Sequence, residues 1–349
     1  MSDRFKKENI NKILVLQTAY IGDVIVSTGI LRELHKIYPQ AKIDIITTPL
    51  SAELFKYNPY ISKIFKFDKK NWKYINFFKL LKTLRTQNYD ISFSIQSSFT
   101  SAILLYLAGI NIRIGFDKQL LTTDSLAMIE KSDRHRSENI VNLLTLLDHT
   151  GKFDHQSELF LSDQEKEKAS SIIRELGAGQ EKLIGIAPGS VRETKKWPPS
   201  YYIELTKKLR DTRTYLFFIG GVDEAQLCDH IIQTSQNHNA KNLAGKLSLL
   251  ESSALIQKMD LMITNDSAPL HMANAVNTDV FAFFGPTIKK YGFFPYREGD
   301  KIFEVKLNCR PCSLHGGASC PEGHQLCMKR IRPEKVLPAI KKKLNITDK

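Results

Sequence analysis

The feature of this chain that most constrains its fold is a repeated alternation of short β-branched runs with longer amphipathic segments. In the first half of the 349 residues, five runs are predicted to be strands: 12–17, 42–47, 61–67, 90–95 and 111–116. The segment 23–38 places Ile30, Leu31, Leu34 and Ile37 on one face, which is typical of an amphipathic helix. Strands that alternate with helices in this way are joined by right-handed crossovers and form a parallel sheet.

The second half repeats this alternation after a polar stretch, residues 150–163, which we interpret as the connection between two domains. A capping box of Ser162 and Glu165 opens a helix that we predict to end at Gly177. Four more strands are predicted at 183–187, 214–219, 261–264 and 280–284, and a last helix at 333–344.

The predicted fold class is therefore α/β, with two Rossmann-like, doubly wound lobes. Residues 1–160 form the first lobe, residues 161–332 form the second, and residues 333–349 form a C-terminal helix and tail that pack back on the body. The length of 349 residues fits two domains of ~150 residues each. Ligands of such folds bind at the carboxyl ends of the strands, so we expect the active site in the cleft between the lobes.

The chain is basic, with 50 Lys and Arg against 37 Asp and Glu and a formal charge of +13. This balance favours an anionic partner (a nucleic acid, an acidic lipid or a phosphorylated substrate), although a lysine-rich proteome gives the same composition. Within residues 65–78, lysines alternate with aromatic residues: Lys66, Lys69, Lys70 and Lys73 with Phe67, Trp72, Tyr74 and Phe77. This segment suits base stacking or contact with anionic lipid headgroups, and a solvated helix start with a buried face explains it equally.

The N-terminal residues 1–12 are charged and lack the apolar core of a secretory signal. The longest nearly apolar stretch, residues 102–110, is about half of the ~20 residues that a membrane-spanning helix needs. We therefore expect a cytoplasmic protein that at most makes peripheral contact with the cytoplasmic face of the inner membrane.

The first predicted strand ends in Q-T-A-Y-I-G-D-V, where Asp23 lies at or just before the start of a helix. One interpretation is a carboxylate that acts as a general base. The other is a helix cap, which Asp often provides, although a cap does not explain Gly22 directly before it. A dinucleotide site would require G-x-G-x-x-G here, so the single Gly22 argues against an NAD enzyme.

The strand 183–187 leads into the sequence P-G-S-V-R-E-T-K-K-W. Gly189 and Ser190 offer hydrogen-bond donors, and Arg192, Lys195 and Lys196 supply positive charge. This combination suits a diphosphate. The alternative is an exposed basic loop with the tryptophan packed beneath it.

The strand 261–264 runs into N-D-S-A-P-L-H, which places Asp266 and Ser267 at a helix start whose N–H groups and dipole attract anions. His271 follows one helical turn after Ser267, on the same face, and a structural histidine is the alternative. Glu224, beside Asp223, is a candidate for holding a ribose hydroxyl or for capping a helix.

Two further observations concern phosphate binding. Thr287, in the strand-end sequence F-G-P-T, is available as a donor. No two aspartates stand two residues apart, so the D-x-D pair with which metal-dependent sugar transferases bridge Mg²⁺ to a diphosphate is missing. The electrostatic work of the metal would then pass to Lys195 and a helix N-terminus.

These motifs, in this order, resemble glycosyltransferase family 9, the lipopolysaccharide heptosyltransferases, over almost the whole chain. They are I-G-D-V at 21–24, A-P-G-S and K-K-W-P within 187–198, N-D-S-A-P-L-H-M-A at 265–273 and F-G-P-T at 284–287. The C-terminal C-R-P-C and C-P-E-G-H-Q-L-C are similar to the branch that transfers the second heptose. The resemblance implies a GT-B fold and inverting, metal-independent transfer of heptose from ADP-L-glycero-D-manno-heptose to the lipopolysaccharide inner core, with no catalytic cofactor and no nucleic-acid partner.

By this resemblance, Asp23 matches the catalytic base and Lys195 matches a lysine that contacts the donor phosphates. The other donor-binding residues it implies are Ser190, Glu224, Asp266, Ser267, Ala268 and His271. Some relatives carry Gly in place of Ala268, where a backbone N–H serves equally. The first lobe is expected to bind the acceptor and the second the donor. The alternatives are transfer of the first heptose or another core sugar, a basic nucleic-acid-binding protein, and a nucleotide-sugar epimerase.

Four of the five cysteines lie close together in the sequence: Cys309, Cys312, Cys320 and Cys327. A Cys-x-x-Cys pair is the usual start of a tetrahedral thiolate site, so a structural zinc or iron ion is one interpretation. The spacing of the second pair is wider than such a site normally allows. Packed, reduced cysteines are the alternative.

Overall fold

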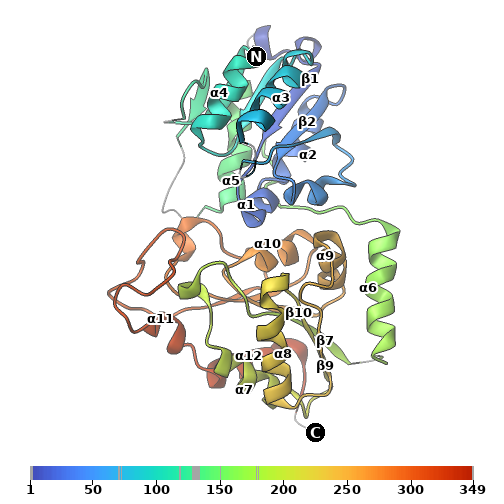
Figure 1. The fold of residues 1–349 in the computed structure, drawn as a ribbon, viewed down its shortest axis with the longest axis vertical. Coiled ribbons are helices and arrows are strands. Elements are labelled where there is room, and N and C mark those ends of the chain that lie inside the picture. Colours follow the sequence, from blue (N-terminus) through green and yellow to red (C-terminus); the bar gives the residue numbers. More distant parts are fainter. Residues whose placement is uncertain are drawn as a thin grey trace. The chain divides into compact units, whose positions relative to one another are not determined.

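The computed structural model describes residues 3–69, 71, 73–117, 119–127, 134–149, 151–177, 179 and 181–347. The chain divides into two compact units, Met1–Phe160 and Leu161–Lys349 (Figure 1). Each unit contains one six-stranded sheet in which every paired strand is parallel. Among the described helices, none is long and apolar enough to cross a membrane.

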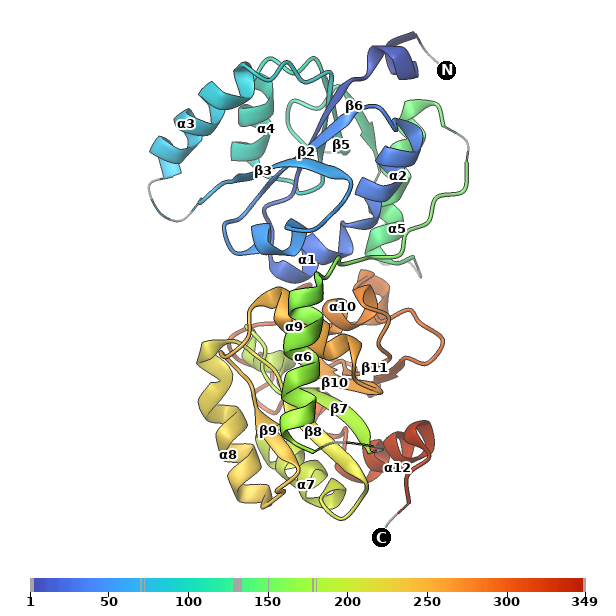
Figure 2. The same ribbon diagram turned by 90° about the vertical axis from the view of Figure 1, so that its right-hand side faces the viewer.

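The sheet of the first unit has the order β3-β2-β1-β4-β5-β6. Its strands are β1 (Lys12–Leu16), β2 (Lys42–Thr47), β3 (Ile61–Lys66), β4 (Ile91–Ser94), β5 (Ile112–Phe116) and β6 (Asp124–Leu126). Its helices are α1 (Ile21–Val26), α2 (Gly29–Ile37), α3 (Lys73–Arg85), α4 (Phe99–Leu107) and α5 (Arg136–Val141). Figure 2 shows α3 and α4 on one side of this sheet and α2 and α5 on the other.

Helices cover both faces of this sheet, and the central strand is therefore apolar at successive positions. Leu14 and Leu16 of β1 pack with Leu80 and Leu84 of α3 and Leu104 of α4. The intervening residues of β1 are buried as well. Continuous burial of this kind is characteristic of a parallel sheet with helices on both faces.

The sheet of the second unit has the order β12-β11-β10-β7-β8-β9. Its strands are β7 (Lys182–Ala187), β8 (Thr214–Phe218), β9 (Ala240–Asn242), β10 (Leu261–Asn265), β11 (Val280–Phe283) and β12 (Lys301–Phe303). Its helices are α6 (Asp163–Glu175), α7 (Pro199–Leu209), α8 (Ala225–Ser235), α9 (Leu249–Gln257), α10 (Ala268–Ala275), α11 (Leu326–Lys329) and α12 (Pro333–Leu344).

Trp197 lies at the centre of the core of this unit. Its ring stacks on Phe283 of β11 with 4.3 Å between ring centroids, and its indole N–H donates to the Ile331 carbonyl. Val336 and Ile340 of α12 are buried in the same cluster. The last helix is thus part of this core.

The main difference from the sequence prediction is in the segment 23–38. The prediction of a single helix there is wrong. The structure has two helices, α1 and α2, with a break at Ser27 and Thr28. Both hydroxyls donate to carbonyls of α1, Ser27 to Val24 at 2.7 Å and Thr28 to Ile25 at 2.8 Å. Such bonds compete with the helical backbone pattern, and periodicity alone does not reveal them.

Three strands were missed, namely β6, β9 and β12. Each has three residues and lies at the edge of its sheet. Three residues are too few to show the alternation of apolar and polar side chains from which a strand is predicted. The predicted capping box of Ser162 and Glu165 is confirmed, and Gly177 follows the end of α6 with a φ of +67°, the left-handed conformation that glycine favours.

Both sheets share one topology. When the strands are numbered within each unit, the order in both sheets is 3-2-1-4-5-6. The chain therefore adds strands first on one side of the first strand and then on the other. The direction reverses between β1 and β4 in the first sheet and between β7 and β10 in the second. Such a switch point is where doubly wound folds bind ligands, beyond the carboxyl ends of the strands. Asp23 follows β1, whereas Lys195 follows β7 and Asp266 follows β10.

Candidate active site

Asn265 joins the two chain segments that leave the switch point of the second unit. Its buried amide donates to the carbonyls of Pro188 and Gly189, at 2.8 and 3.1 Å. Its Oδ1 accepts from the Trp197 N–H at 2.9 Å. The loop after β7 is thereby held against the end of β10. This role was not predicted from the sequence, although a polar residue at the end of an apolar strand is a usable signal.

The same loop brings Lys195 to Asp266. The Lys195 Nζ lies 2.7 Å from Oδ2 of Asp266, and the Thr287 hydroxyl donates to that oxygen at 2.6 Å. The side chains of Lys195 and Asp266 are 15% and 7% exposed, so solvent screens this pair little. The structure therefore brings together a cation, a carboxylate and a hydroxyl that the sequence had placed on three separate strand ends.

His271 lies in α10 within the same electrostatic environment. Burial lowers its pKa to about 4; Asp266 opposes this shift, and Lys195 reinforces it. Its ring also packs edge-on against Phe293. At neutral pH the imidazole is therefore uncharged, which suits a hydrogen-bonding role.

The lowered pKa of His271 predicts a loss of stability in acid. The unfolded chain binds a proton near the ordinary pKa of ~6.5, whereas the folded chain does so only near pH 4. Stability contributed by neutral His271 is therefore lost as the pH falls from 6.5 to 4. Between pH 7 and pH 5 we expect the wild type to lose about 2 kcal/mol more unfolding free energy than His271→Gln. Denaturant titrations of both proteins at the two pH values measure this, and equal losses would contradict it.

Glu224 lies against the loop after β7. A Cβ atom added at Gly189 would meet its Oε1 at 1.5 Å, so a larger residue at this position would displace the Glu224 side chain. The Gly221 N–H donates to its Oε2 at 2.8 Å. Asp223 is exposed, so Glu224 is the acid that adjoins the loop.

The remaining predicted donor-site residues lie at the starts of these same loops. The Ser190 hydroxyl accepts from the Arg192 N–H at 3.3 Å. Ser267 is the N-cap of α10, and Ala268 is its first residue. The Ser267 side chain makes no capping bond, and its Oγ lies 3.2 Å from the Thr264 hydroxyl. The backbone N–H groups at the start of α10 thus belong to the same strand end as Asp266.

The segment after β12 supports the turn that carries Lys195. Gly317 N–H donates to the Thr194 hydroxyl at 2.8 Å, and its carbonyl accepts from the Thr194 N–H. The Gln325 amide donates to the carbonyls of Glu193 and Lys196 at 3.1 and 3.4 Å. These contacts hold both ends of the turn. This supporting role was not predicted from the sequence.

The cysteines of this segment are all free thiols. Cys312, Cys320 and Cys327 line one cavity of about 50 Å³, which Thr194 also lines. Within the described part of the chain, however, no three His, Cys, Asp or Glu side chains are arranged to hold one ion. Cys228, in contrast, is buried in the core of the second unit.

Asp23 occupies the first turn of α1, in the first unit. The N-cap of this helix is Tyr20, which makes no side-chain capping bond, so Asp23 is not the cap. The loop before α1 is tied down by Gln17, whose Oε1 accepts from the Ala19 N–H, and by the Thr18 hydroxyl, which donates to Gln96 beyond β4. Asp23 therefore lies at the switch point of its own sheet.

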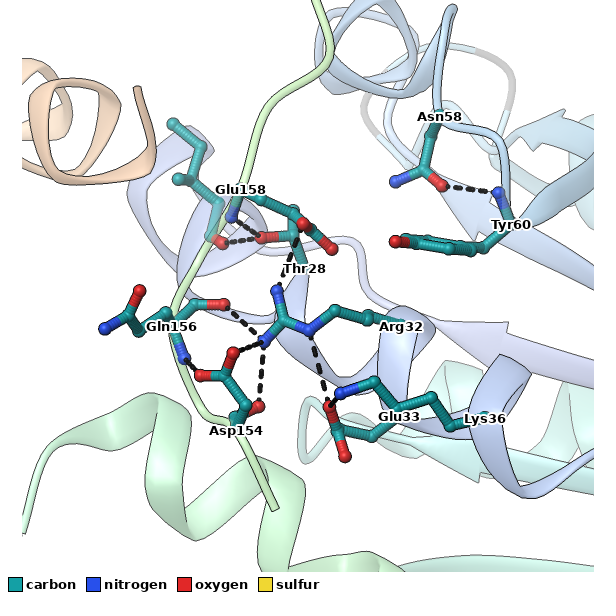
Figure 3. A network of polar contacts seen from close by, with 10 residues as sticks. Thr28, Arg32, Glu33, Lys36, Asn58, Tyr60, Asp154, Gln156 and Glu158 are labelled. Atoms are coloured by element: carbon teal, nitrogen blue, oxygen red, sulfur yellow. Dashed lines mark hydrogen bonds and ion pairs between the residues drawn. The ribbon is translucent and has the colours of Figure 1, made fainter. Parts of the chain in front are cut away.

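The break after α1 is anchored to the last residues of the first unit. Arg32 of α2 donates to the carbonyls of Asp154 and Gln156, and its guanidinium lies 3.1 Å from the carboxylate of Glu158 (Figure 3). The Glu158 N–H donates to the Thr28 hydroxyl at 2.9 Å. This network fixes the segment 154–158 beside the helix pair that carries Asp23.

Two doubly wound units, with charged groups at the switch points, define the GT-B class of glycosyltransferases. The family model described as glycosyltransferase family 9 (heptosyltransferase) matches residues 77–319. This chain belongs to that family and is an enzyme of the glycosyltransferase class.

Three similar proteins illustrate the relationship. The lipooligosaccharide heptosyltransferase 2 of Campylobacter jejuni (strain 81116) is 28% identical over 337 residues, which is 95% of this chain and 98% of the relative. The lipopolysaccharide heptosyltransferase 3 of Escherichia coli is 28% identical over 279 residues, which is 76% and 81%. The solved structure of E. coli ADP-heptose lps heptosyltransferase II superposes with a TM-score of 0.78 at 25% identity and covers 96% of this chain and 98% of that one.

Proposed function

We propose that this enzyme transfers heptose from ADP-L-glycero-D-manno-heptose to the inner core of lipopolysaccharide, as the second heptose. The observation that carries the proposal is the Lys195, Asp266 and Thr287 group beside the α10 N-terminus. A cation and helix N–H groups at a switch point suit a sugar-nucleotide diphosphate. The names of the C. jejuni and E. coli relatives given above support heptose as the sugar.

In this proposal the first unit binds the acceptor and the second binds the donor. Asp23 accepts the proton of the attacking acceptor hydroxyl, and the anomeric carbon is inverted in a single displacement. The negative charge that develops on the departing ADP is stabilised by Lys195 and by the N–H groups at the start of α10. No metal takes part, since Lys195 supplies the positive charge. The enzyme works at the cytoplasmic face of the inner membrane, where its lipid-linked acceptor is exposed.

A second candidate is transfer of another core sugar within the same family. A relative named heptosyltransferase 3 supports it with the same identity, 28%, although that match spans 76% of this chain and the match to the C. jejuni heptosyltransferase 2 spans 95%. The acceptor distinguishes transfer of heptose at another position of the core, and the donor distinguishes transfer of a different sugar.

Mass spectrometry of defined acceptors tests the proposal. Lipopolysaccharide truncated after the first heptose should gain one heptose from ADP-heptose, at the same initial rate with and without EDTA. A gain of mass only on lipopolysaccharide without heptose, or only on lipopolysaccharide with a longer core, would indicate the second candidate. A gain from UDP-sugars alone would overturn the choice of donor. Donor conversion without acceptor would indicate an epimerase, and loss of activity in EDTA that Mg²⁺ restores would overturn the metal-free mechanism.

We also infer that the cysteine segment binds a structural zinc or iron ion. Cys312, Cys320 and Cys327 share one cavity, and Cys309 precedes Cys312 in a Cys-x-x-Cys pair. Because no three side chains of the described residues are already arranged to hold one ion, binding requires these thiols to move closer together. Thiolates at this spacing are ligands that both ions accept. Because this segment supports the Lys195 turn, the ion would stabilise the second unit and would take no part in sugar transfer.

Elemental analysis of protein purified without a metal-affinity tag tests this inference. We expect about one equivalent of zinc or iron, lost in a Cys312→Ser and Cys320→Ser double variant. Cys228→Ser, which removes a cysteine outside the segment, is the matched control and should keep the ion. A metal-free wild type with titratable thiols at all four positions would disprove the site.

A further inference from the structure

The outer face of α3 exposes large apolar side chains. Tyr74, Ile75 and Phe78 are 76%, 49% and 63% exposed. Single exposed apolar residues are ordinary, but three on one face of a helix form an apolar patch, and such patches mark interaction sites. The opposite face of α3 is already buried against the sheet through Leu80 and Leu84. The orientation of α3 in the first unit is therefore fixed, and its exposed apolar residues do not take part in the core of that unit.

Positive charge surrounds these apolar residues. Lys79 and Lys82 project from the same face, since they lie within about one turn of Ile75 and Phe78, and both are exposed. Lys73 at the start of α3 is exposed as well. Residues 73–85 contain no Asp or Glu. The strip is thus apolar, and the charged residues that α3 places beside it are all cations.

The contacts of the neighbouring residues argue against a base-stacking platform. Phe67 is buried in the core of the first unit. The Lys69 ammonium donates to the hydroxyls of Ser98 and Ser101, at 3.3 and 3.2 Å. Neither residue is available to a nucleic acid. Lys70 and Trp72 lie outside the described residues.

We propose that the outer face of α3, defined by Tyr74, Ile75, Phe78, Lys79 and Lys82, docks on an anionic lipid bilayer. A helix with one apolar strip and a cationic border lies in the plane of the interface, with rings at headgroup level and ammonium groups on anionic headgroups. Charge complementarity selects this partner, because the charged residues of α3 are all cations. The docking goes beyond the proposed transfer reaction and would hold the first unit at the surface from which a lipid-linked acceptor projects.

Vesicle co-sedimentation of the full-length protein tests the proposal without relying on sugar transfer. We expect binding to vesicles of phosphatidylethanolamine and phosphatidylglycerol that weakens with salt, and little binding to phosphatidylcholine vesicles. Lys79→Glu with Lys82→Glu should lower the affinity by at least ~20-fold, since each lysine at an anionic surface contributes about fivefold. Tyr74→Ser with Phe78→Ser should lower it by at least ~10-fold.

Matched variants show whether the location matters. Lys7→Glu with Lys42→Glu makes the same charge change at exposed positions elsewhere in the first unit, and Leu120→Ser removes another exposed apolar side chain. Both should bind vesicles more tightly than the α3 variants do.

All variants should keep the wild-type melting temperature, ADP affinity and transfer to a short, water-soluble acceptor. Wild-type vesicle binding by the α3 variants would overturn the proposal, and so would salt-sensitive binding to single-stranded oligonucleotides without binding to vesicles. Loss of transfer alone would count against the proposed function and leave the docking surface intact.

Discussion

Replacing Asp23 by asparagine is expected to lower the turnover number for heptose transfer by ~10²–10⁴-fold. The amide has the shape of the carboxylate but does not accept the proton of the acceptor hydroxyl. The affinity for ADP should not change, because the residues that we propose to bind the donor lie in the second unit, after β7, β8 and β10. Initial rates with saturating donor and acceptor measure the first quantity, and calorimetry measures the second.

The competing explanation is that Asp23 stabilises α1. An acid in the first turn of a helix contributes about 0.3–1 kcal/mol through the helix dipole. That role predicts near-normal turnover with a lower melting temperature, an outcome that would remove Asp23 from the catalytic machinery. Asp117→Asn, the same change at an exposed position of the first unit, is the matched control and should keep full activity.

Replacing Lys195 by alanine is expected to weaken ADP binding by about 10- to 150-fold, as a charge-assisted contact is worth ~1.5–3 kcal/mol. The variant also leaves the Asp266 carboxylate without its cation, beside the proposed phosphate site. Lys196→Ala is the matched control: its ammonium pairs with Glu193, so its loss should have little effect on ADP affinity. Unchanged affinity in Lys195→Ala would move the phosphate contact to Arg192 or Lys196.

A double variant separates the two effects of removing Lys195. If the lysine only neutralises Asp266, then Lys195→Ala with Asp266→Asn should regain wild-type ADP affinity. If the lysine contacts the donor phosphates, the double variant should stay at least ~10-fold weaker than Asp266→Asn alone. Calorimetry of the four proteins gives the coupling between the two side chains directly.

The strand–helix alternation was readable because burial on both faces of a parallel sheet imposes a strong apolar pattern. The central strands β1, β7 and β10 therefore appear in the sequence close to their observed bounds. The edge strands β6, β9 and β12 have three residues each and leave no such pattern. The break between α1 and α2 was also hidden, since it depends on two hydroxyls and on the close approach of the Gln156 carbonyl to Gly29.

The sequence by itself determined which chemical groups stand at the strand ends, because strand, turn and helix starts are local and carry their own signals. Only the tertiary structure decided which of these groups meet. The pairing of Lys195 with Asp266, the bond from Thr287 and the anchoring of the β7 loop by Asn265 all join different strands. The same is true of the cysteine segment, which follows β12 at one edge of the sheet and contacts the Lys195 turn that follows the central strand β7. Local sequence patterns indicate which residue types follow each strand, whereas contacts between distant segments depend on the order and connection of the strands in the sheet.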